Sequence, residues 1–151
     1  MNILFLLTPK AMCAYVREED TIRQALERMA ASGYAAVPIL AKDGTYRGTL
    51  TEGDLLWAIK DLYLMDMKQA EGHGIMEIAR RKDNQPVSVT TAVEDLLEKA
   101  VEQNFVPVVD DRNAFIGIVT RKAIMQYCVK SGLIARPAPS RTEVAHRRAV
   151  T

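Results

Sequence analysis

The sequence predicts an α+β fold of two βαββα repeats that pack sheet to sheet with pseudo-twofold symmetry. One observation behind this is that the same order of sequence signals occurs twice along the chain. A second is that each repeat, at about 55 residues, is too small to cover its own apolar sheet. Hydrophobic residues make up 48% of the 151-residue chain, enough for two small units that share a core.

Each repeat has a predicted helix that begins at a capping box. Thr21 is followed three residues later by Gln24, and Thr91 in the same way by Glu94, so each pair can satisfy two amides of a first helical turn. Apolar residues at helical spacing mark one buried face in each helix. These faces are Ile22, Leu26 and Met29 in the first helix, and Val93, Leu97 and Ala100 in the second.

Two strands and another helix complete each repeat. The strands are predicted at 35–40 and 46–50 in the first repeat, and at 106–109 and 115–119 in the second. Gly44 and Asn113 occupy the same place in the intervening turns, and both residue types tolerate a positive φ. The closing helix of the first repeat is predicted to begin at Thr51 or Glu52, and its apolar residues are Leu55, Leu56 and Ile59. The closing helix of the second repeat is predicted to begin after Thr120.

The spacing of the repeats locates a deletion. The offset is 71 residues from Ile22 to Val93 but 69 from Val37 to Val106, so the second repeat lacks two residues just before its Val-Pro strand. We expect that strand to be shortened. A period near 70 suits duplicated twin domains rather than a solenoid.

The chain divides into four predicted parts. They are a first repeat with an N-terminal segment (1–66), a linker (67–84), a second repeat (85–135) and a mobile tail (136–151). The linker is expected to be largely helical, with a break at Gly72-His-Gly74. The apolar start of the chain is too short to span a membrane, and we expect it to pack onto the body of the protein.

Composition excludes several classes of partner. Twenty basic and 19 acidic residues nearly balance, which indicates neither a nucleic acid nor a membrane partner. Cys13 and Cys128 lie far apart, which favours a reducing, cytoplasmic location over a disulfide framework. His73 and His146 lack ligand-like neighbours, so we expect neither a metal nor a cofactor.

The most informative string is Gly48-Thr-Leu-Thr51-Glu-Gly-Asp54, at a predicted strand-to-helix turn. Its counterpart in the second repeat is Gly117-Ile-Val-Thr120-Arg-Lys-Ala123. Upstream of them stand Val37-Pro-Ile39 and Val106-Pro-Val108. Together these motifs resemble a stand-alone CBS (cystathionine-β-synthase) domain pair, or Bateman module, over roughly residues 7–129.

The resemblance implies a function. Such pairs act as non-enzymatic regulatory sensors that bind an adenine nucleotide, AMP, ATP or cyclic di-AMP, in the cleft between the repeats. It also implies a homodimer and an unidentified regulated protein. Apolar residues of the closing helices are candidates for the dimer surface: Leu56, Trp57, Ile59, Met125 and Tyr127.

The resemblance also assigns ligand-binding residues to two clefts. In the first, Thr51 and Asp54 would hold ribose and phosphate, facing 87–89 and 104–107, of which Val87, Asn104 and Phe105 are the principal candidates. In the second, the candidates are Thr120, Arg121 and Lys122, facing Cys13, Ala14, Tyr15, Tyr34, Ala35, Ala36 and Pro38.

The residues of the first turn are compatible with nucleotide binding and also with a purely structural role as a helix cap. A hydroxyl and free amides at a helix N-terminus suit phosphate, and a carboxylate accepts both hydroxyls of a ribose diol. However, Thr51 and Asp54 also form a cap with Asp in place of Glu. Tyr34 is a base-stacking candidate or a core residue, Trp57 a packing or dimer contact, and Cys13 a structural thiol.

Each cleft departs from the family pattern, and the departures predict a preference. Ala123 replaces the acid of the second cleft, while Arg121 and Lys122 add cations where phosphates would lie. We therefore expect cyclic di-AMP to prefer the Thr120 cleft and AMP or ATP to prefer the Asp54 cleft. The alternatives are a structural dimerisation module with vestigial clefts and, less favoured because no acid–base pair is evident, an enzyme.

Overall fold

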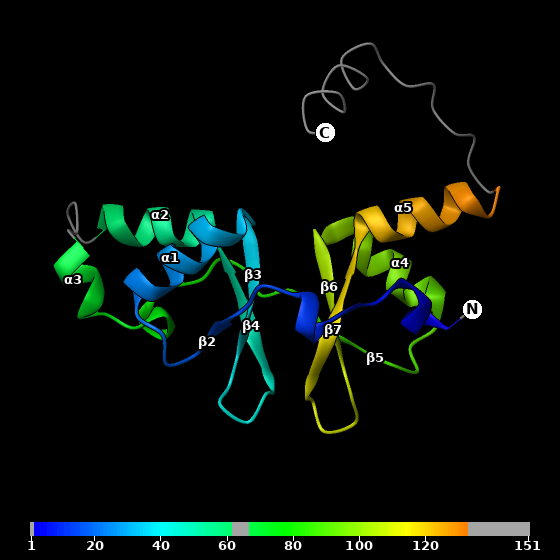
Figure 1. Cartoon of the computed structure of the whole chain (residues 1–151), viewed down its shortest axis with the longest axis horizontal. Coiled ribbons are helices and arrows are strands. Elements are labelled where there is room, and N and C mark those ends of the chain that lie inside the picture. The colour runs from blue at the N-terminus through cyan, green and yellow to red at the C-terminus, as the bar shows by residue number, and fades with distance from the viewer. Residues whose placement is uncertain (1, 62–66, 133–151) are drawn as a thin grey trace, which may run out of the picture.

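The chain forms two similar halves that lie side by side, each an α+β unit (Figure 1). The computed structural model describes residues 2–61 and 67–132. The first half comprises β2 (Val16–Arg17), α1 (Ile22–Ser32), β3 (Ala36–Leu40), β4 (Tyr46–Thr51) and α2 (Glu52–Asp61). The second comprises β5 (Val87–Ser88), α4 (Val93–Glu102), β6 (Phe105–Val109), β7 (Phe115–Thr120) and α5 (Arg121–Lys130). The predicted βαββα repeats are confirmed.

Each half has its own sheet and its own core. The sheets have the strand orders β2-β3-β4 and β1-β7-β6-β5, with β1 (Thr8–Pro9) paired antiparallel to β7. In both halves the first strand runs parallel to the second, which pairs antiparallel with the third. Strand residues expected in the core are buried, namely Val37, Leu50, Val106 and Val119.

The two sheets meet through their hairpins. The amide of Tyr46 donates to the carbonyl of Asn113 at 3.2 Å, and the amide of Phe115 donates to the carbonyl of Gly44 at 3.0 Å. Gly44 and Asn113 both have positive φ, at 88° and 62°, as the turn chemistry predicted. A shared apolar cluster fills the space above these turns, formed by Leu40, Tyr46, Val109 and Phe115.

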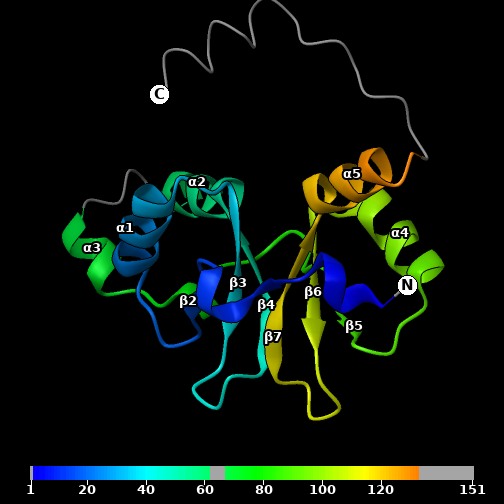
Figure 2. The ribbon, with the colours of Figure 1, turned by 45° about the vertical axis from the view of Figure 1, so that its right-hand side comes forward.

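The segment that precedes each half crosses to the other half (Figure 2). The N-terminal 3-10 turn η1 (Ile3–Leu6) buries Ile3 and Leu6 in the core of the second half, and η2 (Lys10–Met12) follows β1. In the linker, α3 (Met67–Glu71) precedes η3 (Ile75–Glu77), which buries Ile75 in the core of the first half. The predicted packing of the N-terminal segment onto the body of the protein is confirmed, and the segment packs against the second repeat.

The glycine of each strand-to-helix motif makes room for a crossing segment. A Cβ on Gly117 would collide with the carbonyl oxygen of Thr8, and one on Gly48 would lie 2.6 Å from a carboxylate oxygen of Asp83. These close approaches explain why glycine stands at both positions. The motif glycine therefore has a structural use that is independent of any ligand.

Two expectations about the second half are wrong. The helix α4 starts at Val93 with Ala92 as its N-cap, so Thr91 and Glu94 form no capping box; the Thr91 hydroxyl instead accepts from the amide of Ser88. On the same helix, Leu96 is fully buried whereas Leu97 is 40% exposed. In the first half the expected box between Thr21 and Gln24 is present.

The predicted shortening of the second Val-Pro strand is also wrong. β3 and β6 each contain five residues, because the deletion falls before the strand. Helix α1 has 11 residues and ends at Gly33 in the left-handed conformation, whereas α4 has 10 and ends at Gln103 in an extended conformation. The helix and the connection that follows it each lose one residue.

The predicted mobile tail at 136–151, which contains His146, lies outside the described residues. Across 2–61 and 67–132, no helix has both the length and the apolar character that crossing a membrane requires.

The close approach at Gly117 predicts a large effect of one methyl group. Gly117→Ala should lower the free energy of unfolding by about 2 kcal/mol, because backbone rather than a flexible side chain blocks the new Cβ. Gly53→Ala is the control, since its Cβ would meet only the Thr51 hydroxyl at 3.6 Å. In a helix this change is expected to be neutral or to stabilise by up to about 1 kcal/mol. Urea denaturation of both variants measures the difference, and equal stabilities would contradict the close approach.

Candidate functional site

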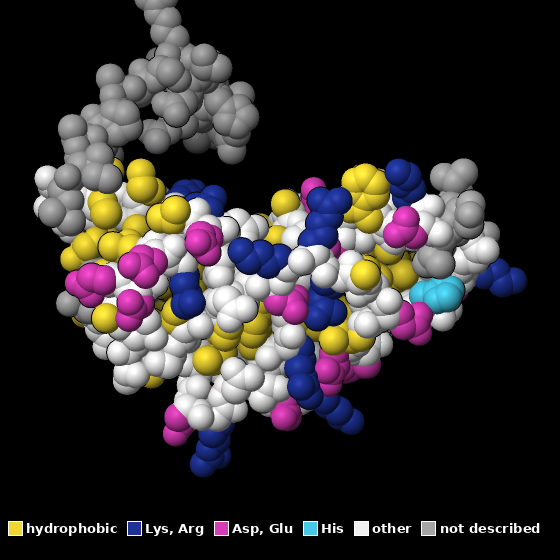
Figure 3. Space-filling view, turned by 180° about the vertical axis from the view of Figure 1, so that it is seen from behind, with side chains coloured by type: hydrophobic (Ala, Val, Ile, Leu, Met, Phe, Trp, Pro, Cys, Tyr) yellow, Lys and Arg dark blue, Asp and Glu magenta, His cyan; other side chains and the backbone are white. Residues whose placement is uncertain are grey.

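The two strand-to-helix turns lie at the same end of the molecule. Helices α2 and α5 both start there, along one edge (Figure 1), and the surface is hollowed between the two halves on that edge (Figure 3). The candidate residues Thr51 and Asp54 belong to the turn β4–α2, and Thr120, Arg121 and Lys122 to the turn β7–α5. Both expected turns are therefore present.

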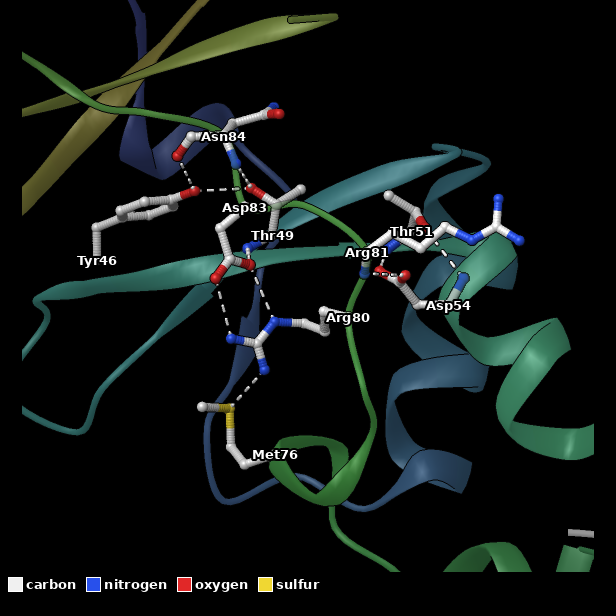
Figure 4. A network of polar contacts seen from close by, with 9 residues as sticks. All are labelled: Tyr46, Thr49, Thr51, Asp54, Met76, Arg80, Arg81, Asp83 and Asn84. Atoms are coloured by element: carbon white, nitrogen blue, oxygen red, sulfur yellow. Dashed lines mark hydrogen bonds and ion pairs between the residues drawn. The ribbon is translucent and has the colours of Figure 1, made fainter. Parts of the chain in front are cut away.

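At the first turn, the carboxylate of Asp54 is fully engaged (Figure 4). One oxygen accepts from the amide of Thr51 at 3.0 Å, while the Thr51 hydroxyl accepts from the amide of Asp54 at 3.0 Å. The other oxygen accepts from the amide of Arg81 at 3.2 Å. Asp54 is only 2% exposed. The cap considered from sequence is thus formed, and the linker covers the carboxylate.

A closed ring of hydrogen bonds ties the linker to β4 (Figure 4). The phenol of Tyr46 donates to the carbonyl of Asn84 at 2.7 Å, and the amide of Asn84 donates to the Thr49 hydroxyl at 3.2 Å. Because the single phenol proton is used on Asn84, the Thr49 hydroxyl donates to Tyr46 at 2.7 Å. Burial, reinforced by the charge of Asp83, raises the pKa of Tyr46 to about 12, against the opposing bond from Thr49.

An ion pair extends this ring. The guanidinium of Arg80 contacts both carboxylate oxygens of Asp83, at 2.9 and 3.1 Å, and the amide of Thr49 donates to the same carboxylate at 2.9 Å. Burial acts to raise the pKa of Asp83, but the hydrogen bonds from Arg80 and Thr49 outweigh it and hold the pKa below its usual range. The linker is therefore held against β4 by an ion pair and by hydrogen bonds.

The same linker reaches the second half. The side-chain amide of Asn84 donates to Asn104 Oδ1 at 3.0 Å and to the carbonyl of Phe105 at 3.1 Å. The side chain of Gln103 is almost fully buried. It accepts a hydrogen bond from the backbone amide of Gln85 and donates one to the backbone carbonyl of the same residue. Asn104 and Phe105 thus join Thr49 through Asn84, whereas Val87 lies in the core of the second half.

The second turn has the opposite charge. Thr120 caps α5 by accepting from the amide of Ala123 at 3.1 Å, in a first turn that contains Arg121 and Lys122. The first turn of α2 contains instead Glu52 and Asp54. Arg121 donates to the carbonyls of Ala100 and Val101, at 2.7 and 3.0 Å, and so binds the end of α4. Lys122 is exposed.

The segments expected to face Thr120 are divided between two places. Cys13 and Tyr15 pack with Ile118 of β7 against the shared apolar cluster, and the Cys13 thiol donates to the carbonyls of Thr8 and Pro9 at 3.4 Å. Burial raises the pKa of this thiol, against an opposing hydrogen bond from the amide of Ile118. Ala14 is partly buried against the first core.

The other expected segment lies beside the first turn. Ala36 pairs with Thr51 in the first sheet, the carbonyl of Ala35 accepts from the amide of Glu52, and Pro38 lies further along the same strand. Tyr34 is 56% exposed, so the core alternative for this ring is wrong.

The residues that sequence reasoning missed are in the linker. Arg80 to Gln85 belong to the predicted linker, yet their backbone amides donate to side chains of both halves, namely Asp54, Thr49 and Gln103. The 71-residue offset could have identified the last two of them, Asn84 and Gln85, because it maps Cys13–Val16 onto 84–87 rather than onto 87–89.

Two equivalent hollows flank the closing helices. One, of about 290 Å³, lies beside α2; the other, of about 300 Å³, lies beside α5. The first is lined by Ile22, Trp57, Ala58, Asp61, His73, Glu77, Ile78 and Ala79. The second is lined by Phe5, Leu6, Leu7, Thr8, Ala123, Gln126, Tyr127 and Lys130. The repeat offsets relate the linings, so that Asp61 corresponds to Lys130.

Comparison with known proteins places the chain among relatives. The family model described as "CBS domain" matches residues 9–61 and 75–130. No curated protein sequence matches the chain. A CBS domain protein of Streptococcus pneumoniae TIGR4 has a similar structure, with a TM-score of 0.75, 25% identity and coverage of 85% of this chain and 86% of that one.

Two further solved structures share the fold. The CbpB protein of Listeria monocytogenes in complex with c-di-AMP has a TM-score of 0.73 and 22% identity, covering 83% of this chain and 92% of that one. The structure of CBSX2 in complex with AMP has a TM-score of 0.70 and 21% identity, covering 87% and 98%.

The hydrogen-bonded ring at Tyr46 predicts a stability change with a particular pH dependence. Tyr46→Phe should cost about 1–2 kcal/mol at neutral pH, because two buried bonds are lost. In the wild type, the pKa of Tyr46 is about 10 in the unfolded chain and about 12 in the folded protein. The contribution of the Tyr46 hydroxyl to the free energy of unfolding is therefore complete below pH 10 and is lost as the pH rises towards 12. The gap between wild type and variant should therefore narrow above pH 10 in chemical denaturation. Tyr34→Phe, at an exposed position, is the control. A stability difference between wild type and Tyr46→Phe that widens above pH 10 would contradict the raised pKa of Tyr46.

Proposed function

Because the chain belongs to the CBS domain family, we propose that it is a non-enzymatic sensor that binds an adenine nucleotide between its two halves. The ligand is cyclic di-AMP or a linear nucleotide such as AMP or ATP. The observation that carries the proposal is the charge contrast between the two turns, Arg121 and Lys122 at one and Glu52 and Asp54 at the other. Anions are stabilised at a helix N-terminus, and more so where added cations lie.

Two relatives support the choice of ligand class. The Listeria monocytogenes CbpB structure contains c-di-AMP, and the CBSX2 structure contains AMP. Both ligands combine adenine with ribose and phosphate, so the same cleft chemistry serves either. The difference between them lies in the free hydroxyls of the ribose.

The Thr120 cleft suits cyclic di-AMP. Each ribose of a 3′,5′-cyclic dinucleotide has only its 2′-hydroxyl free, so Ala123 in place of an acid costs this ligand little. Its phosphodiesters would lie by the hydroxyl of Thr120 and the ammonium of Lys122. Arg121 contributes positive charge from its position over the end of α4.

The Asp54 cleft suits a linear nucleotide, which has a 2′,3′-diol. Such a ligand needs a carboxylate acceptor, and Asp54 supplies one only if the amide of Arg81 gives up its bond. Nucleotide binding there would therefore move the linker and with it the strand contact at Asn84. A ligand that shifts this linker changes how the halves meet, which is a means of signalling to a regulated protein.

We further propose that the sensor is cytoplasmic and acts as a homodimer. Leu56, Trp57 and Met125, three of the five residues expected at the dimer surface, are exposed by 40–64%. Ile59 and Tyr127 are half-buried, and Tyr127 packs against the core of the second half. We therefore assign the proposed dimer surface to Leu56, Trp57 and Met125.

Titration calorimetry with cyclic di-AMP tests the assignment of the clefts. Lys122→Ala should weaken binding roughly tenfold or more, because one charge-assisted contact is worth about 1.5–3 kcal/mol. Lys42→Ala, which removes an equally exposed cation from the hairpin turn of the first half, is the matched control and should change nothing.

Asp54→Asn separates the two ligands in the same experiment. It keeps a side-chain oxygen for capping but weakens the acceptor, so AMP binding should fall while cyclic di-AMP binding is unchanged. If Asp54→Asn abolishes cyclic di-AMP binding and Lys122→Ala leaves it intact, the assignment of the clefts is wrong.

A structural dimerisation module with vestigial clefts is the second candidate, favoured by the occupied carboxylate of Asp54. Thermal denaturation with a nucleotide panel distinguishes the two. A sensor should gain about 2.7 kcal/mol of stability at a ligand concentration of about 100 times Kd, and its Tm should rise accordingly. No rise with any adenine nucleotide would favour the structural module.

A further inference from the structure

One flank of helix α1 is covered by the segment that follows the first half. That segment contains α3, which lies against α1 (Figure 1). Its Ala70 is buried in the core of the first half, and its Glu71 forms an ion pair with Arg23 of α1. Leu26 of α1 is partly buried against the same core. The first helix of this half is therefore covered by a segment that comes after the half is complete.

The corresponding flank of α4 is uncovered in the described part of the chain. The 71-residue offset places Leu97 at the position of Leu26 and Val101 at the position of Ala30. Leu97 is 40% exposed and Val101 is 79% exposed. Two neighbouring apolar side chains on a surface are ordinary by themselves. Here they indicate a contact, because the equivalent flank of the other half is covered.

Acidic residues border this apolar strip of Leu97 and Val101. Helix α4 has a formal charge of −3, from four acidic residues and one lysine: Glu94, Asp95, Glu98, Glu102 and Lys99. Helical spacing places Glu94 and Glu98 next to the strip and Lys99 on the opposite flank. Figure 3 shows acidic side chains gathered on the second half with hydrophobic side chains beside them.

These acids have no cation of their own. Within residues 2–61 and 67–132, none of the four forms an ion pair. Arg121 lies at the C-terminal end of α4, but its guanidinium donates to the carbonyls of Ala100 and Val101. The flank is therefore both apolar and negatively charged.

The two halves have opposite charges at equivalent positions of this flank. In the first half the helix supplies the cation, Arg23, and the covering segment supplies the acid, Glu71. Glu94 stands at the position of Arg23. A segment that covers α4 in the same way should therefore supply cations.

The C-terminal segment 133–151 has this charge and follows the second half as α3 follows the first. An offset of 69 residues relates α2 to α5, so Glu71 corresponds to Ser140, which is next to Arg141. The segment has a side-chain formal charge of +3, from four arginines and one glutamate: Arg136, Arg141, Arg147, Arg148 and Glu143. Its 19 residues can extend to about 60 Å, and α4 with its ten residues is only about 15 Å long. The segment can therefore reach all of α4 from the end of α5.

We propose that residues 133–151 dock on α4 of the same chain, along the strip of Leu97 and Val101. Arginines of the segment pair with Glu94 and Glu98, and its apolar residues cover the strip. The docked segment completes the second half as α3 completes the first. This contact depends on neither the nucleotide nor the homodimer proposed above.

Paramagnetic broadening of amide signals in the full-length chain tests the contact. A nitroxide is attached to Ala145→Cys in a chain that also has Cys13→Ala and Cys128→Ala. The amide signals of Leu97 and Val101 should lose most of their intensity and recover it in part at high salt. The amides of Leu26 and Ala30, at the equivalent positions of α1, are the control and should keep theirs. No broadening at Leu97 and Val101, or equal broadening on both helices, would overturn the proposal.

A mixed sample identifies which copy supplies the segment. Nitroxide-bearing chains without isotope label are mixed with isotope-labelled chains that have no nitroxide. Docking within one chain predicts no broadening at Leu97 and Val101 in this mixture. Broadening there would mean that a second copy supplies the segment, and the contact within one chain would be wrong.

Trypsin cleavage gives an independent result in a chain that keeps both cysteines. Glu94→Gln with Glu98→Gln should speed cleavage after Arg141 roughly threefold to tenfold, because each exposed ion pair contributes up to about 1 kcal/mol. Glu19→Gln with Asp111→Asn, at exposed positions outside α4, is the matched control and should cleave at the wild-type rate. Equal melting temperatures establish that the variants are folded alike. Wild-type cleavage in the Glu94 and Glu98 variant would overturn the docking on α4.

Discussion

Neither half of this protein is complete without the segment that precedes the other half. Ile3 and Leu6, which precede the first half, fill the core of the second, and Ile75, which precedes the second, fills the core of the first. The crossings are close: a Cβ at position 117 would collide with the backbone of Thr8, and one at position 48 with the carboxylate of Asp83. Because a unit of about 55 residues buries little apolar surface and is only marginally stable by itself, this exchange adds to the core of each repeat.

The same crossing brings the linker against the candidate residues of the first turn. The linker contacts both halves: the amide of Arg81 donates to the carboxylate of Asp54, and Asn84 joins Thr49 to Asn104. Among the described residues, every buried side-chain polar atom has a hydrogen-bond partner. A ligand bound at Asp54, as proposed above, would have to exchange hydrogen bonds with the linker, and the same few groups also join the two halves.

Duplication followed by divergence accounts for the difference between the two clefts. Both turns keep the threonine that caps the next helix, at Thr51 and Thr120. The positions after it now have opposite charge, and the same contrast continues along the helices to Asp61 and Lys130. A single chain thus has an acidic and a basic version of the same strand-to-helix turn, and the ligand preference proposed above rests on this difference.

The sequence by itself determined the repeat, the order of elements, the buried strand residues such as Val37 and Val106, and the positive φ at Gly44 and Asn113. These follow from local patterns, because hydrophobic period and turn chemistry act over a few residues. The sequence also located the turns at Thr51 and Thr120. Only the tertiary structure decided that Leu96 rather than Leu97 faces the core, that the deletion shortens a helix and the connection after it rather than a strand, and that Arg81 covers Asp54. Each of these depends on how a helix is rotated against its sheet or where a distant segment crosses, and such long-range contacts leave no local signal in the sequence.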